Sequence, residues 1–151
     1  MARIIVRDTT PLGLASKPRG KPDGDRCRAW LAGFAAAGAR VVVPEIADYE
    51  VRRDLIRNNA TAGLGRLDRL GRVLEYAVIT TAVMREAAEK IWAQARRAGI
   101  PTADPKALDG DCILEAQALL AGGATDDVTV ATSNLVHLGR FVDAQLWESI
   151  T

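Results

Sequence analysis

Short β-branched runs separated by longer stretches with helical periodicity place the tightest limit on how this 151-residue chain can fold. The runs are RIIVR at 3–7, ARVVV at 39–43 and VTVAT at 128–132. Their apolar residues follow one another without alternation, which is typical of strands covered on both faces. Such strands, alternating with helices, build a parallel sheet between helical layers. The sequence therefore predicts a three-layer α/β/α sandwich with a mainly parallel central sheet, in a single domain spanning 1–151.

Amphipathic or alanine-rich stretches fill the intervals between these runs. Proline and small polar residues stop the first strand, so Asp8 is expected at its C-terminal end. The segment SKPRGKPDGD at 16–25 is rich in proline, glycine and charge, and is predicted to be a loop. The predicted helices cover about 25–37, from 44 to the stop signal at 58–59, 64–76, from a cap at Thr80 or Thr81 to 98, and from Asp111 to the glycine pair at 122–123.

Composition excludes several classes of protein. The 20 basic and 19 acidic residues give a net charge of +1, so any contact with nucleic acid must come from local patches. No apolar run approaches the roughly 20 residues of a membrane span, and the N-terminus lacks the longer apolar stretch of a secretory signal. We therefore expect no membrane span and a cytoplasmic location. Cys27 and Cys112 lie far apart without metal-binding spacing and are interpreted as free thiols.

Polar residues stand at or near the ends of the predicted strands. Asp8 follows the first strand, Glu50 belongs to the helix after the second, Asp111 opens a later helix, and Asn134 follows the last strand. Because sites in parallel sheets form at the C-terminal ends of strands, we expect these side chains to converge. Three carboxylates repel one another unless a cation lies between them, and oxygen ligands favour Mg²⁺ or Mn²⁺ over zinc.

The order of these segments resembles the acidic pattern of the PIN-domain family across nearly the whole chain. In this resemblance Asp8 matches the first-strand aspartate, Glu50 the helix glutamate and Asp111 the aspartate before an apolar helix. Asn134 matches a position often held by aspartate. The matching segments are IIVRDTTPLG, PEIADYEVRRDL, DCILEAQAL and VTVATSNLVHL.

The resemblance implies a Mg²⁺- or Mn²⁺-dependent endoribonuclease, with Asp8 and Asp111 as the main metal ligands. Glu50 would bind the metal, directly or through water, or act as the base, and the sequence leaves these roles open. A neutral amide at Asn134 adds no negative charge, which favours one metal over two. Small stand-alone PIN domains resemble VapC-type toxins of type II toxin–antitoxin pairs. That analogy implies an RNA substrate, a small antitoxin partner and a homodimer.

Each candidate also has a purely structural interpretation. Asp8 could cap a turn, Glu50 could form a surface pair with Arg53, and Asp109 competes with Asp111 for the helix start. The lone His137 and the three tryptophans are interpreted as packed or surface residues. Two alternatives to the nuclease therefore stay open, a catalytically weak PIN-like module that binds RNA or regulates, and a non-catalytic α/β interaction protein.

Basic residues cluster in and after the loop that follows Asp8, and one more lies beside Glu50. They could follow the phosphates of RNA near the metal, or they could be solvated charges. The candidate RNA contacts are Lys17, Arg19, Lys21, Arg26, Arg28 and Arg53.

Overall fold

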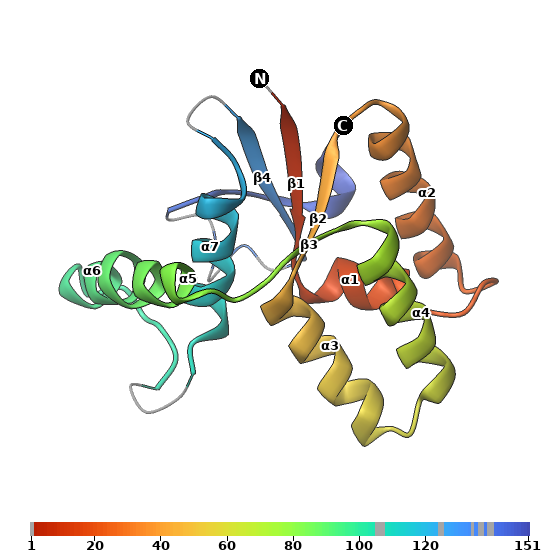
Figure 1. The fold of residues 1–151 in the computed structure, drawn as a ribbon, viewed down its shortest axis with the longest axis horizontal. Helices are drawn as coiled ribbons and strands as arrows, with labels where there is room; N and C mark the ends of the chain where they lie inside the picture. Colours follow the sequence, from red (N-terminus) through yellow and green to blue (C-terminus); the bar gives the residue numbers. More distant parts are fainter. Residues whose placement is uncertain (1, 105–107, 124–125, 134, 136–137, 139–140) are drawn as a thin grey trace.

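A computed structural model describes residues 2–104, 108–123, 126–133, 135, 138 and 141–151. Its central sheet has five strands in the order β3-β2-β1-β4-β5, and each neighbouring pair is parallel (Figure 1). The predicted parallel sheet is therefore confirmed. The strands are β1 (Arg3–Arg7), β2 (Arg40–Pro44), β3 (Glu75–Ala77), β4 (Asp127–Thr132) and β5 (Asp143–Leu146).

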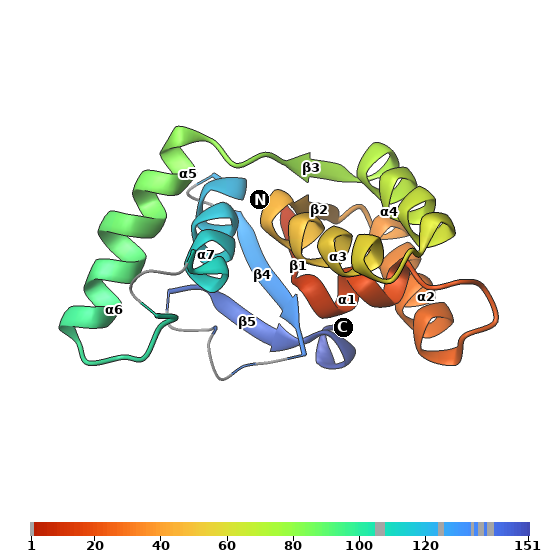
Figure 2. The same cartoon turned by 90° about the horizontal axis from the view of Figure 1, so that it is seen from below.

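Helices cover both faces of this sheet, which confirms the three-layer architecture. Figure 2 shows α5, α6 and α7 on one side, with α1, α2 and α4 on the other. The helices are α1 (Thr9–Ala15), α2 (Pro22–Ala36), α3 (Glu45–Arg57), α4 (Thr61–Val73), α5 (Thr81–Glu86), the π-helical η1 (Ala87–Trp92), α6 (Ala93–Arg97), α7 (Gly110–Ala121) and the 3-10 turn η2 (Trp147–Ser149).

Successive residues of β1 supply opposite faces of the core. Ile4 and Val6 pack with residues of α5, η1 and α7, whereas Ile5 packs with residues of α2 and with Trp147. A third cluster joins α1, α3 and α4 beside β2. Burial on both faces explains why the central strands are continuous apolar runs. Both cysteines are buried and free, and among the described helices none is long and apolar enough to cross a membrane.

The chain after Asp8 differs from the sequence prediction. The prediction placed a turn there, but Thr9–Ala15 forms a helix with Asp8 as its N-cap. Pro11 lies in the first turn of α1, where a missing backbone N–H costs no helical hydrogen bond. The following loop is also shorter than predicted, because α2 already begins at Pro22, and proline is favoured at the first helical position.

Two edge strands were not predicted. The helix expected at 64–76 ends at Val73, and Glu75–Ala77 forms β3 beside β2. Leu74 and Tyr76 pack on the same apolar cluster as Leu67, so their helical spacing was misleading. The other edge strand, β5, is a four-residue segment (DAQL) without a β-branched run. The end of α3 at Asn58 and the capping of α5 by Thr80 agree with the prediction.

Candidate active site

Asp8 lies where β1 ends and α1 begins, and hydrogen bonds of its backbone N–H and of both carboxylate oxygens fix it. Its backbone N–H donates to the carbonyl of Ala131 in β4 at 2.9 Å. Its Oδ1 accepts from the backbone N–H of Thr9 at 2.7 Å, and its Oδ2 accepts from the Thr132 hydroxyl at 2.7 Å. The capping role is therefore confirmed. It is compatible with a ligand role, because an ionised carboxylate has about four lone-pair sites.

Glu50 lies on α3 and reaches the start of α7. A Cβ atom added at Gly110 would come within 2.8 Å of Glu50 Oε1, so the carboxylate lies against the first residue of α7. The other oxygen, Oε2, is 4.0 Å from Arg53 Nη2. The expected i,i+3 pair with Arg53 therefore forms at the distance limit of an ion pair, while the carboxylate is directed to another element.

The electrostatics of Glu50 connect it to the other two candidate acids. Burial raises the pKa of Glu50, and the negative charges of Asp8 and Asp111 raise it further. Arg53 and a hydrogen bond with the Thr9 side chain oppose this shift. The C-terminal ends of β1 and β2 and the start of α7 lie at the same end of the sheet (Figure 1). Glu50 thus lies within electrostatic reach of both Asp8 and Asp111.

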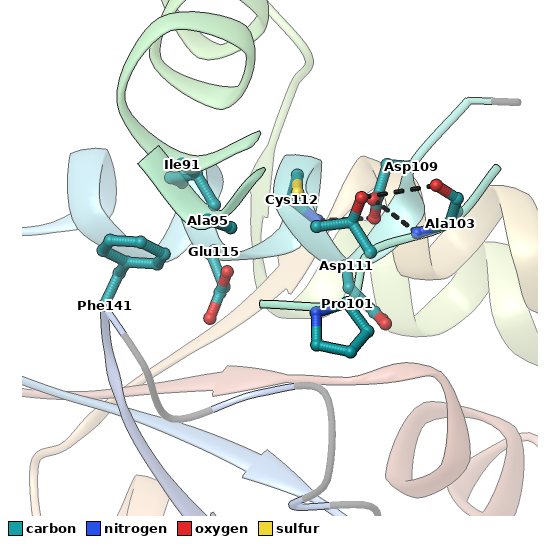
Figure 3. A pocket seen from close by; sticks show the side chains of 10 residues that line it. Ile91, Ala95, Pro101, Ala103, Asp109, Asp111, Cys112, Glu115 and Phe141 are labelled. Carbon is teal, nitrogen blue, oxygen red and sulfur yellow. Dashed lines mark hydrogen bonds between the residues drawn. The ribbon is translucent and has the colours of Figure 1, made fainter. Parts of the chain in front are cut away.

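Asp109 and Asp111 have different roles at the start of α7. Asp109 is the N-cap, with Oδ1 accepting from the Cys112 backbone N–H at 3.2 Å and Oδ2 from the Ala103 backbone N–H at 3.0 Å (Figure 3). The expectation that Asp111 opens the helix was therefore wrong, since α7 begins at Gly110. Because Asp109 is the cap, a ligand role for Asp111 does not compete with capping.

Asp111 lines two adjacent cavities. The first, of about 400 Å³, is also lined by Glu50, Arg53 and Tyr49. The second, of about 210 Å³, also includes Glu115 (Figure 3). The two cavities share Ala103, Asp109 and Asp111 among their lining residues. Glu50 and Asp111 therefore line one cavity from two helices.

Glu115 is a candidate that the sequence analysis missed. It is only 3% exposed and lies four residues after Asp111 on α7. Side chains at this spacing share one helix face, and both acids line the smaller cavity. A search for acids at i and i+4 on the predicted apolar helix could have identified it. Glu115 therefore adds a second carboxylate of α7 to the lining of the smaller cavity.

The donor chemistry fits a hard divalent cation. Asp8, Glu50 and Asp111 offer only oxygen. The pKa of Glu50 is raised by burial first and then by the negative charges of Asp8 and Asp111, which a cation would offset. Within the described part of the chain, no three Asp, Glu, His or Cys side chains form a group that could hold a metal ion. Mg²⁺ needs no such cage, since it usually binds one or two carboxylates and keeps several waters. Asn134 and His137 lie outside the described residues.

The candidate RNA contacts fall into two places. Arg53 lines the larger cavity beside Glu50. Lys17, Arg19 and Lys21 lie in the loop after α1, at the end of that helix away from Asp8, and a seven-residue helix is about 10 Å long. Arg26 and Arg28 lie on α2. Lys17 pairs with Asp23 at 2.7 Å, and Arg28 pairs with Asp25 and donates to the Lys17 carbonyl at 2.7 Å. A role in RNA binding stays a prediction for Lys17, Arg19, Lys21, Arg26, Arg28 and Arg53.

Comparison with solved structures supports the fold. The chain is similar to a chain in the crystal structure of VapBC2 from Rickettsia felis bound to a DNA fragment from its promoter. The TM-score is 0.69 at 12% sequence identity, and the match covers 94% of this chain and 97% of that chain. At this identity the match shows a shared fold, the one that the PIN-domain resemblance implied. Comparison of the sequence with protein-family models and with curated proteins finds no match.

Proposed function

We propose that the chain is a Mg²⁺- or Mn²⁺-dependent endoribonuclease of the PIN-domain type. The observation that carries the proposal is that Glu50 lies against the first residue of α7 and lines one cavity with Asp111, with the charge of Asp8 acting on the same glutamate. The three acids come from three separate elements, and Asp8 and Asp111 both raise the pKa of Glu50. The shared fold with a chain of the VapBC2 complex supports the same conclusion.

In this proposal each acid has a role that follows from its surroundings. Asp8 is held rigidly by Thr9 and Thr132, so it would present its remaining lone pairs to a cation together with Asp111. A bound cation would activate water and neutralise a phosphodiester oxygen. Glu50 is half-buried and its pKa is raised, so it is a stronger proton acceptor than an exposed glutamate. We therefore assign the base role to Glu50.

The reaction can be tested with paired RNA and DNA pools of the same mixed sequence, incubated with Mg²⁺. We expect cleavage of the RNA into products with 5′-phosphate and 3′-hydroxyl ends, because a water-derived hydroxide attacks the phosphorus and the ribose 3′-oxygen leaves. End-labelling with and without phosphatase treatment measures the chemistry of the ends. Intact RNA would contradict the proposal, as would 5′-hydroxyl products, because they require the 5′-oxygen to leave; a 2′,3′-cyclic phosphate on the other product would show attack by the ribose 2′-hydroxyl.

We further propose that this activity is that of a toxin held in check by a small antitoxin. The proposal rests on the shared fold with a chain of the VapBC2 complex, together with the PIN-domain resemblance of the sequence. Induced expression of the chain is expected to arrest growth, and co-expression of a small protein encoded beside it should restore growth. Arrest that persists when Asp8 and Asp111 are both replaced by asparagine would show that it does not come from the nuclease.

Gly110→Ala tests whether the position of Glu50 matters. The new methyl group would meet Glu50 Oε1 at 2.8 Å, and the end of this flexible side chain would move aside. We expect cleavage to fall by a factor on the order of 10–100, because a misplacement of about 1 Å can cost 100-fold. The free energy of unfolding should change by no more than about 0.5 kcal/mol. Initial cleavage rates and urea unfolding measure the two effects.

Gly65→Ala is the matched control for this variant. Gly65 is exposed within α4, and an added Cβ would meet no atom within 4 Å. Alanine there should raise the free energy of unfolding by about 0.5–1 kcal/mol and leave cleavage unchanged. Equal cleavage by the Gly110→Ala and Gly65→Ala proteins would show that the position of the Glu50 carboxylate does not matter for cleavage.

A further inference from the structure

An aromatic ring and a guanidinium group stand together on the wall of the larger cavity. Tyr49 precedes Glu50 on α3, and Arg53 follows four residues after Tyr49, so both lie on one helix face. The Arg53 guanidinium carbon is 5.4 Å from the centroid of the Tyr49 ring. Both residues line the cavity of about 400 Å³ that also contains Glu50 and Asp111.

Stability of the fold does not account for this pair. Tyr49 is 52% exposed, and the Arg53 side chain is 57% exposed. The ion pair of Arg53 with Glu50 spans 4.0 Å, and exposed pairs of this kind contribute little to stability. Buried residues on the same helix, such as Ile46 and Val51, supply its packing. The pair therefore presents an aromatic ring and a cation to the solvent inside the cavity.

These two groups match the two chemical parts of a nucleotide. Nucleobases stack on exposed aromatic rings regardless of sequence, and arginine binds phosphate through charge-assisted hydrogen bonds. The apolar lining residues Ile46, Ala103 and Leu108 offer additional contacts for a base or ribose. The volume lies in the range of pockets that accept small ligands, roughly 300–1,000 Å³. Bases within a duplex are already stacked, so this surface suits a single strand.

We propose that Tyr49 and Arg53 form a nucleotide subsite that positions single-stranded RNA. The ring stacks on one nucleobase, and the guanidinium binds a phosphate next to the one that approaches Glu50 and Asp111. This inference rests on the proposed nuclease function. It assigns Tyr49 and Arg53 to substrate binding, so their loss raises KM more than it lowers kcat.

The stacking is tested by binding to the Asp8→Asn protein, which is expected to retain its fold and to cleave the probe at least about 100-fold more slowly than the wild type. The probe is a pool of short single-stranded RNAs that carry the fluorescent base 2-aminopurine, with Mg²⁺ present. Adding Tyr49→Ala should weaken binding roughly five- to 150-fold and abolish quenching of 2-aminopurine, since stacking on one ring is worth about 1–3 kcal/mol. Adding Tyr49→Trp should preserve both. Ile56→Ala is the control, because Ile56 is 58% exposed on the same helix but does not line the cavity.

The phosphate contact is tested by the dependence of affinity on salt. Arg53→Gln should reduce the slope of log K against log salt concentration by about 0.7, the contribution of one contact to a single strand. Arg57→Gln is the control, because Arg57 lies on the same helix and pairs with Asp54 at 3.3 Å. An equal slope for the two variants would overturn the role of Arg53.

The outcomes separate this inference from the proposed function. If the wild-type protein cleaves RNA while Tyr49→Ala leaves affinity, quenching and KM unchanged, the subsite is wrong and the nuclease stands. If the Asp8→Asn protein binds no RNA and the wild type cleaves none, both proposals are overturned. Restoration of affinity and quenching by Tyr49→Trp, with Ile56→Ala indistinguishable from the parent, establishes the stacking role.

Discussion

Replacing Asp8 by asparagine is expected to reduce RNA cleavage by at least about 100-fold, because even partners that only orient metal ligands cost roughly 10–100-fold when lost. The fold should be retained. Asparagine caps helices as well as aspartate does, and its oxygen can still accept from the backbone N–H of Thr9. Its amide can donate to the Thr132 hydroxyl, which now accepts the hydrogen bond. Only the negative charge is lost.

Initial rates with labelled RNA, together with urea unfolding, measure the two sides of this prediction. Asp8→Ala is the comparison, because it removes the cap as well as the charge and should lower the free energy of unfolding by about 1 kcal/mol. An Asp8→Asn protein that cleaves RNA within a few-fold of the wild type would show that Asp8 serves only as a cap.

The second large effect is expected at Asp111, with its neighbour Asp109 as the matched comparison. Asp111→Asn should lower cleavage by at least about 100-fold, as for Asp8. Asp109→Asn should keep cleavage within a few-fold, because Asp109 accepts from backbone N–H groups of Cys112 and Ala103. One of these hydrogen bonds is lost in the amide, at a cost of at most about 1 kcal/mol of stability.

The comparison requires the same RNA pool and the same metal concentration for both variants. Unfolding in urea gives the stability of each, so that a loss of cleavage can be separated from a loss of folded protein. If Asp109→Asn lowered cleavage more than Asp111→Asn, Asp109 rather than Asp111 would be the residue of the active site.

The buried part of the fold could be predicted from the sequence, whereas the edges could not. The three central strands are uninterrupted apolar runs because both of their faces are covered, and such short β-branched runs are typical of this arrangement. The edge strands lack that constraint. Leu74 precedes β3 and Tyr76 lies in it, yet both continue the helical spacing of the leucines in α4. In β5 the only large apolar residue is a leucine at the end of the strand. Only pairing with β2 and β4 identifies these segments as strands.

The candidate site shows the same limit. From the order of strands and helices, the sequence could predict that the elements carrying Asp8, Glu50 and Asp111 meet at the C-terminal end of the parallel sheet. It could not decide between Asp109 and Asp111, because the N-cap depends on which carboxylate meets the N–H of Cys112. The burial of Glu115 likewise depends on which face of α7 turns to the sheet.

Distance along the chain was a poor guide to the basic residues. Lys17 and Arg28 follow Asp8 closely in sequence, but the turn expected after Asp8 is a helix that carries the chain away from the site. Arg53, more than forty residues later, lines the larger cavity with Glu50. Closeness to Asp8 in sequence therefore did not show which basic residues lie near the site, because α1 lies between Asp8 and the loop that follows.

The central claim is that Asp8 and Asp111 belong to one cation-dependent centre for RNA cleavage. The most direct measurement compares the wild type with the Asp8→Asn/Asp111→Asn protein on a mixed RNA pool, with Mg²⁺ or Mn²⁺ and with EDTA. We expect cleavage by the wild type with either metal, none with EDTA, and none by the double variant under any condition. Cleavage that persists in EDTA, or in the folded double variant, would contradict the claim.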